Sequence, residues 1–250
     1  MMHRFFVAPN ALDRRPVLLD GEQAYQIRRV LRMRPGERVT LLDNCGWAYE
    51  ASLLSYGASE ARFEIVGRWT AQGEPHTHIT LCQAVLRGEK FGWMLQKGTE
   101  VGVSRFVPLI CERNVVDDRG AAEQKRERWE RIIREAAEQS GRGRLPVLAP
   151  AQSFEAQVQA GSSGSAVSAR LILWEEERGT TLRQALAGCN LGEGARIELL
   201  VGPEGGFAAA EVELAERCGA RRASLGPRTL RAETAGVVAA AAILYEAGEM

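Results

Sequence analysis

The sequence lacks the marks of a secreted, membrane-spanning or zinc-binding protein. Its five cysteines are scattered along 250 residues, with no Cys-x-x-Cys pair and no Cys/His spacing typical of zinc. We expect them to be reduced thiols of a cytoplasmic protein without a metal site. The N-terminus has no apolar stretch of signal-peptide length, and the longest apolar run, residues 236–244, is too short to cross a bilayer. No membrane partner is therefore expected.

Motifs of the common enzyme classes are missing as well. The chain has no Gly-x-Gly-x-x-Gly, no Walker A loop, no Gly-x-Ser-x-Gly and no His-Glu-x-x-His. The histidines, His3, His76 and His78, form no convincing acid–base or metal-binding set. These absences argue against P-loop enzymes, serine hydrolases and zinc proteases, and weaken the case for a nucleotide-binding oxidoreductase.

No excess of one charge marks the chain. It has 32 Lys and Arg against 32 Asp and Glu, so its overall balance does not indicate a nucleic-acid partner. The basic residues cluster locally, however. Five arginines fall between positions 28 and 38, and they form either a solvated helix face or a stripe that binds phosphates.

What is present predicts two domains, at residues 1–72 and 73–250. The first has a helical pattern at residues 22–33 and short alternating segments with turn residues between them, which favour a small β-barrel. From residue 79 onward, strand patterns alternate with helical ones, which favours an α/β domain with a mainly parallel sheet. The expected strands of the first domain are 4–7, 39–42, 48–54 and 61–66. Those of the second are 78–84, 106–110, 145–148, 171–174, 196–201 and 222–225, with helices at 90–101, 123–138, 154–159, 181–187 and 208–218 and a Gly/Ser-rich loop at 162–168.

Two glycine-containing loops near the C-terminus carry most of the functional information. A strand at residues 196–201 runs into GPEGGF, and a strand at 222–225 runs into LGPRTLRAETA, after which a strongly apolar helix follows. Open α/β sheets bind ligands at the carboxyl ends of their strands, and glycines there allow the backbone to approach a ligand. Alternatively, the first loop is only a tight turn, and Glu233 or Thr234 in the second only caps the helix.

A third candidate lies at the end of the long charged helix. The segment EAAEQSGR stops at Gly141, a natural helix terminator, which leaves Gln139 and Arg142 at the tip. These two side chains could reach an RNA base or phosphate. The charged positions before them fit a solvated helix face.

These segments together resemble a known family. IELLVGPEGGF and LGPRTLRAETA, preceded by LQKGTEVGV and EAAEQSGR, are similar to the small-subunit ribosomal RNA uridine-N3 methyltransferases of the SPOUT superfamily, which use S-adenosylmethionine. The similarity runs from HRFFV to the last helix. It implies a PUA-like RNA-binding β-barrel followed by a SPOUT domain with a deep trefoil knot, assembled as a homodimer.

The resemblance also implies roles for individual residues. Glu233 would be the base or would only orient Arg231, the other candidate catalytic residue, and the substrate would be naked small-subunit ribosomal RNA or the assembled subunit. A methyltransferase for another RNA and a non-catalytic RNA-binding relative remain as alternatives. The expected cofactor-binding residues are Trp174, Glu175, Gly202, Pro203, Glu204, Gly205, Gly206, Leu225, Gly226, Leu230, Arg231, Thr234 and Ala235; the expected RNA-binding residues are Arg4, Arg28, Arg29, Arg32, Arg34, Gln139 and Arg142.

Overall fold

The computed structural model describes residues 2–114, 119–160 and 167–250. The chain divides into two compact units. The N-terminal unit comprises Met1–Glu74 and Arg134–Leu145, and the C-terminal unit comprises Pro75–Ile133 and Pro146–Met250. Most of the glycine- and serine-rich loop expected at residues 162–168 lies outside the described residues.

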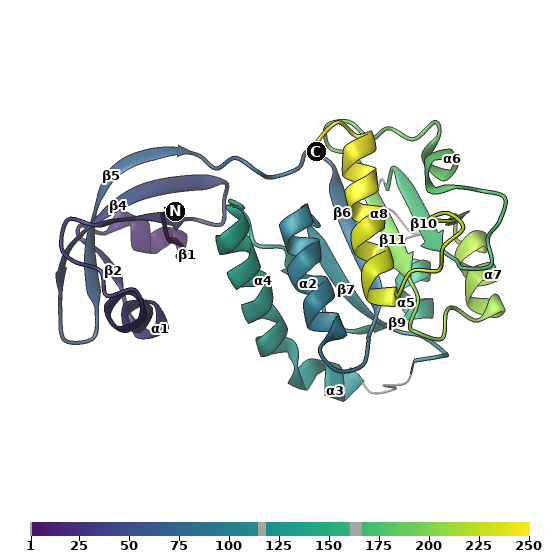
Figure 1. Ribbon diagram of the computed structural model, residues 1–250, viewed down its shortest axis with the longest axis horizontal. Helices are drawn as coiled ribbons and strands as arrows, with labels where there is room; N and C mark the ends of the chain where they lie inside the picture. The colour runs from purple at the N-terminus through teal and green to yellow at the C-terminus, as the bar shows by residue number, and fades with distance from the viewer. Residues whose placement is uncertain (1, 115–118, 161–166) are drawn as a thin grey trace. The chain divides into compact units, whose positions relative to one another are not determined.

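The N-terminal unit contains a curled five-stranded sheet (Figure 1). Its strands pair in the order β1-β3-β4-β5-β2, and all pairs except β1–β3 are antiparallel. The register shifts twice between the two long strands, which bends a sheet and increases its twist. The sheet curls over its own apolar core, which includes Phe5, Val39 and Phe63. The strand bounds are β1 Arg4–Phe6, β2 Val17–Leu19, β3 Arg38–Leu42, β4 Trp47–Tyr56 and β5 Ala61–Thr70.

The helix expected at residues 22–33 forms in two parts. α1 (Gly21–Tyr25) continues into a π-helical turn, η2 (Gln26–Val30), and a short 3-10 helix, η1 (Pro9–Asp13), precedes them. Ile27 is fully buried, whereas the neighbouring arginines lie on the exposed side. The expected apolar face is met only in part, because Tyr25 and Val30, which the pattern placed beside Ile27, are each 63% exposed. Regular α-helix also ends eight residues earlier than expected.

The C-terminal unit is an α/β domain built on a sheet of parallel strands, as the alternating pattern predicted. Its strands run in the order β12-β10-β11-β6-β7-β8, with β9 also paired to β7. α2 and α8 lie side by side on one face, and α5 and α7 cover the other (Figure 1). The strands are β6 His78–Ala84, β7 Arg105–Ile110, β8 Val147–Leu148, β9 Gln152–Ser153, β10 Ala169–Leu173, β11 Arg196–Val201 and β12 Arg221–Ala223. The helices are α2 Lys90–Val101, α3 Arg119–Gln124, α4 Arg126–Ser140, α5 Phe154–Ala160, α6 Leu182–Leu186, α7 Ala209–Arg217 and α8 Ala232–Glu246, of which α4 belongs to the N-terminal unit from Arg134 onward.

The central strands are buried on both faces, as near-continuous apolar runs require. One charged pair interrupts this core. Arg170 and Glu198 occupy paired positions on β10 and β11 and form an ion pair of 2.9 Å. The Arg170 guanidinium also donates to the carbonyls of Val158 and Cys218, near the ends of α5 and α7. Because its partners satisfy it, this buried charge ties both helices to the sheet.

The final helix packs on its own unit, as expected from its composition. Ala239, Ala240, Ile243 and Leu244 of α8 are fully buried, whereas Val238 and Tyr245 are 40% and 69% exposed. Among the described residues, no helix has the length and apolar character needed to span a membrane.

Candidate functional site

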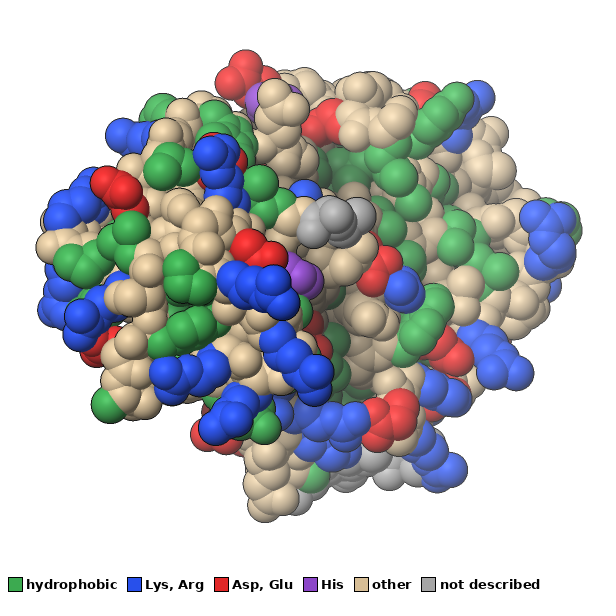
Figure 2. Space-filling view, turned by 60° about the vertical axis from the view of Figure 1, so that its left-hand side comes forward, with side chains coloured by type: hydrophobic (Ala, Val, Ile, Leu, Met, Phe, Trp, Pro, Cys, Tyr) green, Lys and Arg blue, Asp and Glu red, His purple; other side chains and the backbone are tan. Residues whose placement is uncertain are grey.

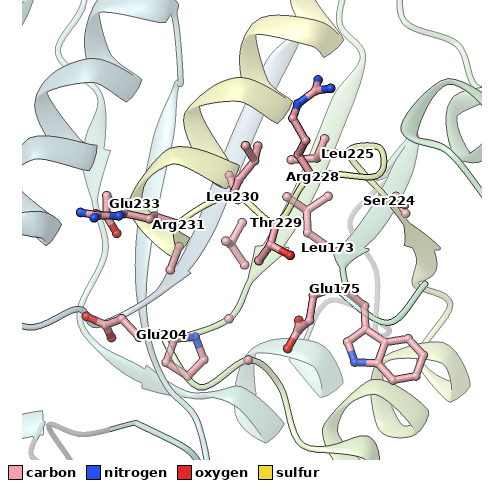
Figure 3. A pocket seen from close by; sticks show the side chains of 18 of the residues that line it. Leu173, Glu175, Glu204, Ser224, Leu225, Arg228, Thr229, Leu230, Arg231 and Glu233 are labelled. Atoms are coloured by element: carbon pink, nitrogen blue, oxygen red, sulfur yellow. The ribbon is translucent and has the colours of Figure 1, made fainter. Parts of the chain in front are cut away.

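A pocket of about 400 Å³ lies in the C-terminal unit, where β10, β11 and β12 end (Figure 3). This is the edge at which parallel α/β sheets form ligand sites. Both glycine-containing loops and the first turn of α8 form its walls. The lining residues are Lys90, Leu173, Trp174, Glu175, Arg178, Val201, Gly202, Pro203, Glu204, Gly206, Ala223, Ser224, Leu225, Gly226, Arg228, Thr229, Leu230, Arg231, Ala232, Glu233 and Ala235.

The first wall is the GPEGGF loop, residues 202–207, which other elements hold in place. Gln83 Nε2 donates to the Gly202 carbonyl over 3.1 Å. The Glu204 carboxylate accepts from Lys90 Nζ over 3.0 Å and from the Arg87 amide over 3.3 Å. These contacts fix both the backbone and one carboxylate of the loop.

The glycines of this loop differ in what they require. Gly206 has a φ of +68°, and a Cβ there would lie 1.9 Å from Glu175 Oε1. Only glycine fits this position without strain and without displacing the Glu175 carboxylate. Gly205 does not line the pocket: a Cβ there would make an ordinary 3.5 Å contact with Arg113. Its expected contact with a cofactor therefore stays a prediction that the pocket geometry does not favour.

The second wall, residues 225–231, has few braces. Gly226 has a φ of +103°, and its amide donates to Ser224 Oγ over 3.2 Å. Arg228, Thr229 and Arg231 are exposed. Figure 3 shows Arg228 extending away from Thr229 and Glu175, so these side chains of one short loop take different directions.

Glu233 lies in the first turn of α8 and is only 9% exposed. Its Oε2 atom is buried and has no hydrogen-bond partner among the described residues, while Oε1 lies 4.0 Å from Nη1 of the exposed Arg231. The helix N-terminus favours negative charge there. A buried carboxylate oxygen with unused hydrogen-bonding capacity, at the wall of a pocket, is a candidate proton acceptor.

A second carboxylate of the pocket is held in its charged form. Burial acts to raise the pKa of Glu204, but hydrogen bonds from Lys90 and from backbone amides outweigh it, so the pKa lies below its usual value. The rim is thus charged at neutral pH.

The pocket brings together most of the residues expected to bind a cofactor. Gly205 and Thr234 are the two expected residues that do not line it. Arg228 and Thr229 were missed although they belong to the LGPRTLRAETA motif. Arg178 was also missed, although it lies three residues after the expected Glu175, and Lys90 comes from a distant segment to which no sequence signal pointed. The expected cofactor-binding residues that line the pocket are Trp174, Glu175, Gly202, Pro203, Glu204, Gly206, Leu225, Gly226, Leu230, Arg231 and Ala235, and the expected catalytic residue Glu233 lies beside them; their roles stay predictions.

The expected RNA-binding residues differ in availability. Arg142 is 3% exposed and forms a 2.9 Å ion pair with Glu74, so the expectation that it reaches RNA from the helix tip is corrected: its guanidinium is internal to the N-terminal unit. Arg4 donates to the carbonyls of Glu138 and Gln139 and so caps the end of α4.

The remaining candidates are exposed. Arg28 stacks on the Tyr56 ring at 4.7 Å and donates to the Gly57 carbonyl. Gln139, Arg29, Arg32 and Arg34 are also exposed. Figure 2 shows Lys and Arg side chains in several groups on the face drawn there, interspersed with hydrophobic ones. The described residues contain no cluster of three or more His, Cys, Asp or Glu side chains suited to a metal ion.

Comparison with known proteins places the chain in a family. Residues 73–244 match the RNA methyltransferase domain family. Ribosomal RNA small subunit methyltransferase E of Bacillus subtilis is 32% identical over 98% of this chain and 97% of its own length, and its Synechocystis counterpart is 35% identical over 97% and 77%. The Neisseria gonorrhoeae enzyme of that name, in a crystal structure bound to S-adenosyl methionine, superposes with a TM-score of 0.85 at 31% identity over 98% of both chains. The chain therefore belongs to the RNA methyltransferase family, among the relatives of ribosomal RNA small subunit methyltransferase E.

Proposed function

We propose that this protein methylates N3 of a specific uridine in small-subunit ribosomal RNA, with S-adenosylmethionine as the methyl donor. The observation that carries the proposal is the buried Glu233 carboxylate, which has an oxygen without a hydrogen-bond partner at the wall of a pocket formed by two glycine-containing loops. The names of the relatives support the substrate class, and the bound ligand of the Neisseria enzyme supports the donor.

The residues present fit the donor. A volume of about 400 Å³ is in the range of small-molecule sites. Leu173, Leu225 and Leu230 offer an apolar lining suited to an adenine ring, and Glu175 and Glu204 offer negative charge to a cationic ligand. When bound, S-adenosylmethionine would supply an electrophilic methyl group on a positively charged sulfur.

Glu233 and Arg231 carry the proton chemistry in this proposal. N3 of uridine carries a proton at neutral pH, and this proton must be removed before or during methyl transfer. Glu233 accepts that proton, and Arg231 stabilises the negative charge that develops on a uridine carbonyl oxygen. Because N3 lies on the Watson–Crick edge, the target base must be unpaired or extruded.

Methyl transfer to unmodified small ribosomal subunits and to naked ribosomal RNA tests the proposal directly. Incorporation of labelled methyl from S-adenosylmethionine, with the product mapped by nucleoside mass spectrometry, should give 3-methyluridine at one position. Comparing the two substrates shows which form is used. Methylation at another base or atom, or binding of either RNA without transfer, would refute the proposal.

The exposed arginines of the N-terminal unit supply the proposed RNA contact. Changing Arg29 and Arg32 to Ala should weaken RNA binding and reduce the slope of log K against log[salt] by roughly 0.7 per lost phosphate contact. The exposed Arg183 of α6 provides a control, and Arg183→Ala should leave the slope unchanged. An unaltered slope in the double variant would mean that Arg29 and Arg32 do not contact RNA phosphates and only form a solvated helix face.

The proposal extends to finer features of the architecture. The N-terminal sheet serves as a PUA-like barrel for RNA, the C-terminal unit contains the trefoil knot of SPOUT enzymes, and the protein acts as a homodimer. The exposed Val238 and Tyr245 of α8 are candidates for a two-fold contact. Val238→Arg should then yield monomers in light scattering; wild-type protein that is monomeric at micromolar concentration would exclude the dimer.

A further inference from the structure

Gln83 is a fully buried amide at the end of β6, and it does not line the pocket. Its side chain crosses to the neighbouring strand β11, where Nε2 donates to the Gly202 carbonyl over 3.1 Å and to the Val201 carbonyl over 3.5 Å. These two carbonyls define the orientation of the amide, because both require a donor. Gln83 therefore holds the point at which strand β11 turns into the GPEGGF loop.

The other end of the same amide is unsatisfied. Gln83 Oε1 is buried without a hydrogen-bond partner among the described residues, and an ideal Cβ on Gly236 of α8 would approach it to 3.1 Å. A buried polar atom without a partner disfavours the folded state. An apolar side chain of similar shape would remove that penalty, although it would also leave the Gly202 carbonyl without this donor, so its two effects on folding oppose each other. Folding alone thus gives a weak reason for glutamine at this position.

We propose that Gln83 is a positioning residue for the cofactor, acting through the Gly202 peptide. The inference rests on the proposed function, since it assigns Gln83 to the same S-adenosylmethionine site. Gly202 and Pro203 form part of the pocket wall, and no side chain of the loop itself fixes the Gly202 carbonyl among the hydrogen bonds of the described residues. Without the Gln83 donor, this peptide can adopt other orientations, and the bound ligand must then order the wall.

Gln83→Met tests the role because methionine keeps the length and approximate shape but removes both amide groups. We expect S-adenosylmethionine to bind about tenfold more weakly in calorimetry, because one donor to a buried carbonyl is lost. The melting temperature of the ligand-free protein should fall little or not at all, since the unsatisfied Oε1 disappears as well. Single-turnover methyl transfer at saturating cofactor should remain close to wild type.

Gln157→Met is the matched control. Gln157 of α5 also donates from Nε2, but to Glu198 on the opposite face of the sheet. This variant should lose thermal stability and keep wild-type cofactor affinity. Gln83→Met should therefore lower cofactor affinity and spare the melting temperature, whereas Gln157→Met should lower the melting temperature and spare cofactor affinity.

A Gln83→Met protein with wild-type affinity and a lower melting temperature would overturn the inference and leave a purely structural role. If that variant does not fold, Gln83→Leu replaces it under the same criteria. Wild-type protein that binds no S-adenosylmethionine would instead refute the proposed function. The two failures are thus distinguishable.

Discussion

The two loops that wall the pocket are built in opposite ways. Residues 202–207 are held from outside by Gln83, Lys90 and Arg113, which belong to other parts of the chain. Residues 225–231 are held mainly by their own neighbour Ser224 and present exposed arginines and a threonine. Contacts from distant segments hold the first wall, whereas the side-chain hydrogen bonds that the second makes among the described residues are local to it, which leaves it more room to adjust to a bound molecule.

This difference suggests a division of labour. A pre-formed wall reduces the ordering cost of binding a small ligand, so the braced loop suits the cofactor. An adjustable wall next to the candidate base suits a large substrate whose reactive nucleotide must be placed after binding. Changes in the first loop should therefore alter cofactor affinity, and changes at the end of the second should alter turnover.

The largest expected effect lies just after the second wall, at Glu233 in the first turn of α8. If Glu233 removes the N3 proton, Glu233→Gln should lower the single-turnover rate by on the order of 10²-fold or more, with nearly normal cofactor affinity, because glutamine keeps the shape. Activity should recover in part at high pH, where uridine ionises without help. A loss that high pH does not rescue would mean that Glu233 only orients Arg231.

Arg231→Lys sharpens that test. Lysine keeps the charge but loses the planar fork of donors, so turnover should fall while cofactor binding persists. The side chain is 83% exposed, which makes a large loss of folding stability unexpected. Full single-turnover rates in both variants would show that other residues carry the chemistry.

The braced wall should respond in binding instead. Gly206→Ala places a methyl group against Glu175 at a positive φ, with a strain of about 1–2 kcal/mol. We expect cofactor affinity in calorimetry to fall about tenfold. Gly205→Ala is the matched control, because its Cβ has room beside Arg113, and it should bind nearly as wild type. Equal losses in both would show that the loop as a whole, and not the position facing Glu175, governs affinity.

The sequence predicted the parts of this site that follow from local chemistry. Buried strands such as β11 are marked by continuous apolar runs, and both loops are marked by glycine and proline after such runs. The expected helices and strands of the C-terminal unit therefore lie within a few residues of their observed bounds. The prediction that regular α-helix continues after Tyr25 was wrong, because the chain changes there to π-helical hydrogen bonding. The residue pattern does not mark such a change.

What the sequence could not predict depends on contacts between distant segments. The sequence placed Arg142 at an exposed helix tip, whereas in the structure it is buried and forms an ion pair with Glu74, which lies far away in the chain. Gln83 had the context of an ordinary strand residue, and its reach to Gly202 depends on the pairing of β6 with β11. Polar side chains at strand ends take their role from the neighbouring strand, which no local pattern specifies.

The smallest expected effect concerns the ion pair between Glu204 and Lys90, which should contribute to stability in a pH-dependent way. Because the pKa of Glu204 is lowered in the folded protein, its contribution to stability is present above the unfolded-state pKa, about 4.3, and is lost as pH falls through the lower folded-state value. Glu204→Gln should therefore lower the free energy of unfolding at pH 7, and the difference from wild type should shrink as the pH falls through the lowered folded-state pKa. Its size should be about 0.5 kcal/mol, since the pair with Lys90 is partly exposed. Denaturant titrations of both proteins between pH 3 and 7 measure it. A difference that does not shrink as the pH falls would mean that the glutamine disturbs the loop for reasons other than the lost charge, and that the ion pair with Lys90 does not hold the loop.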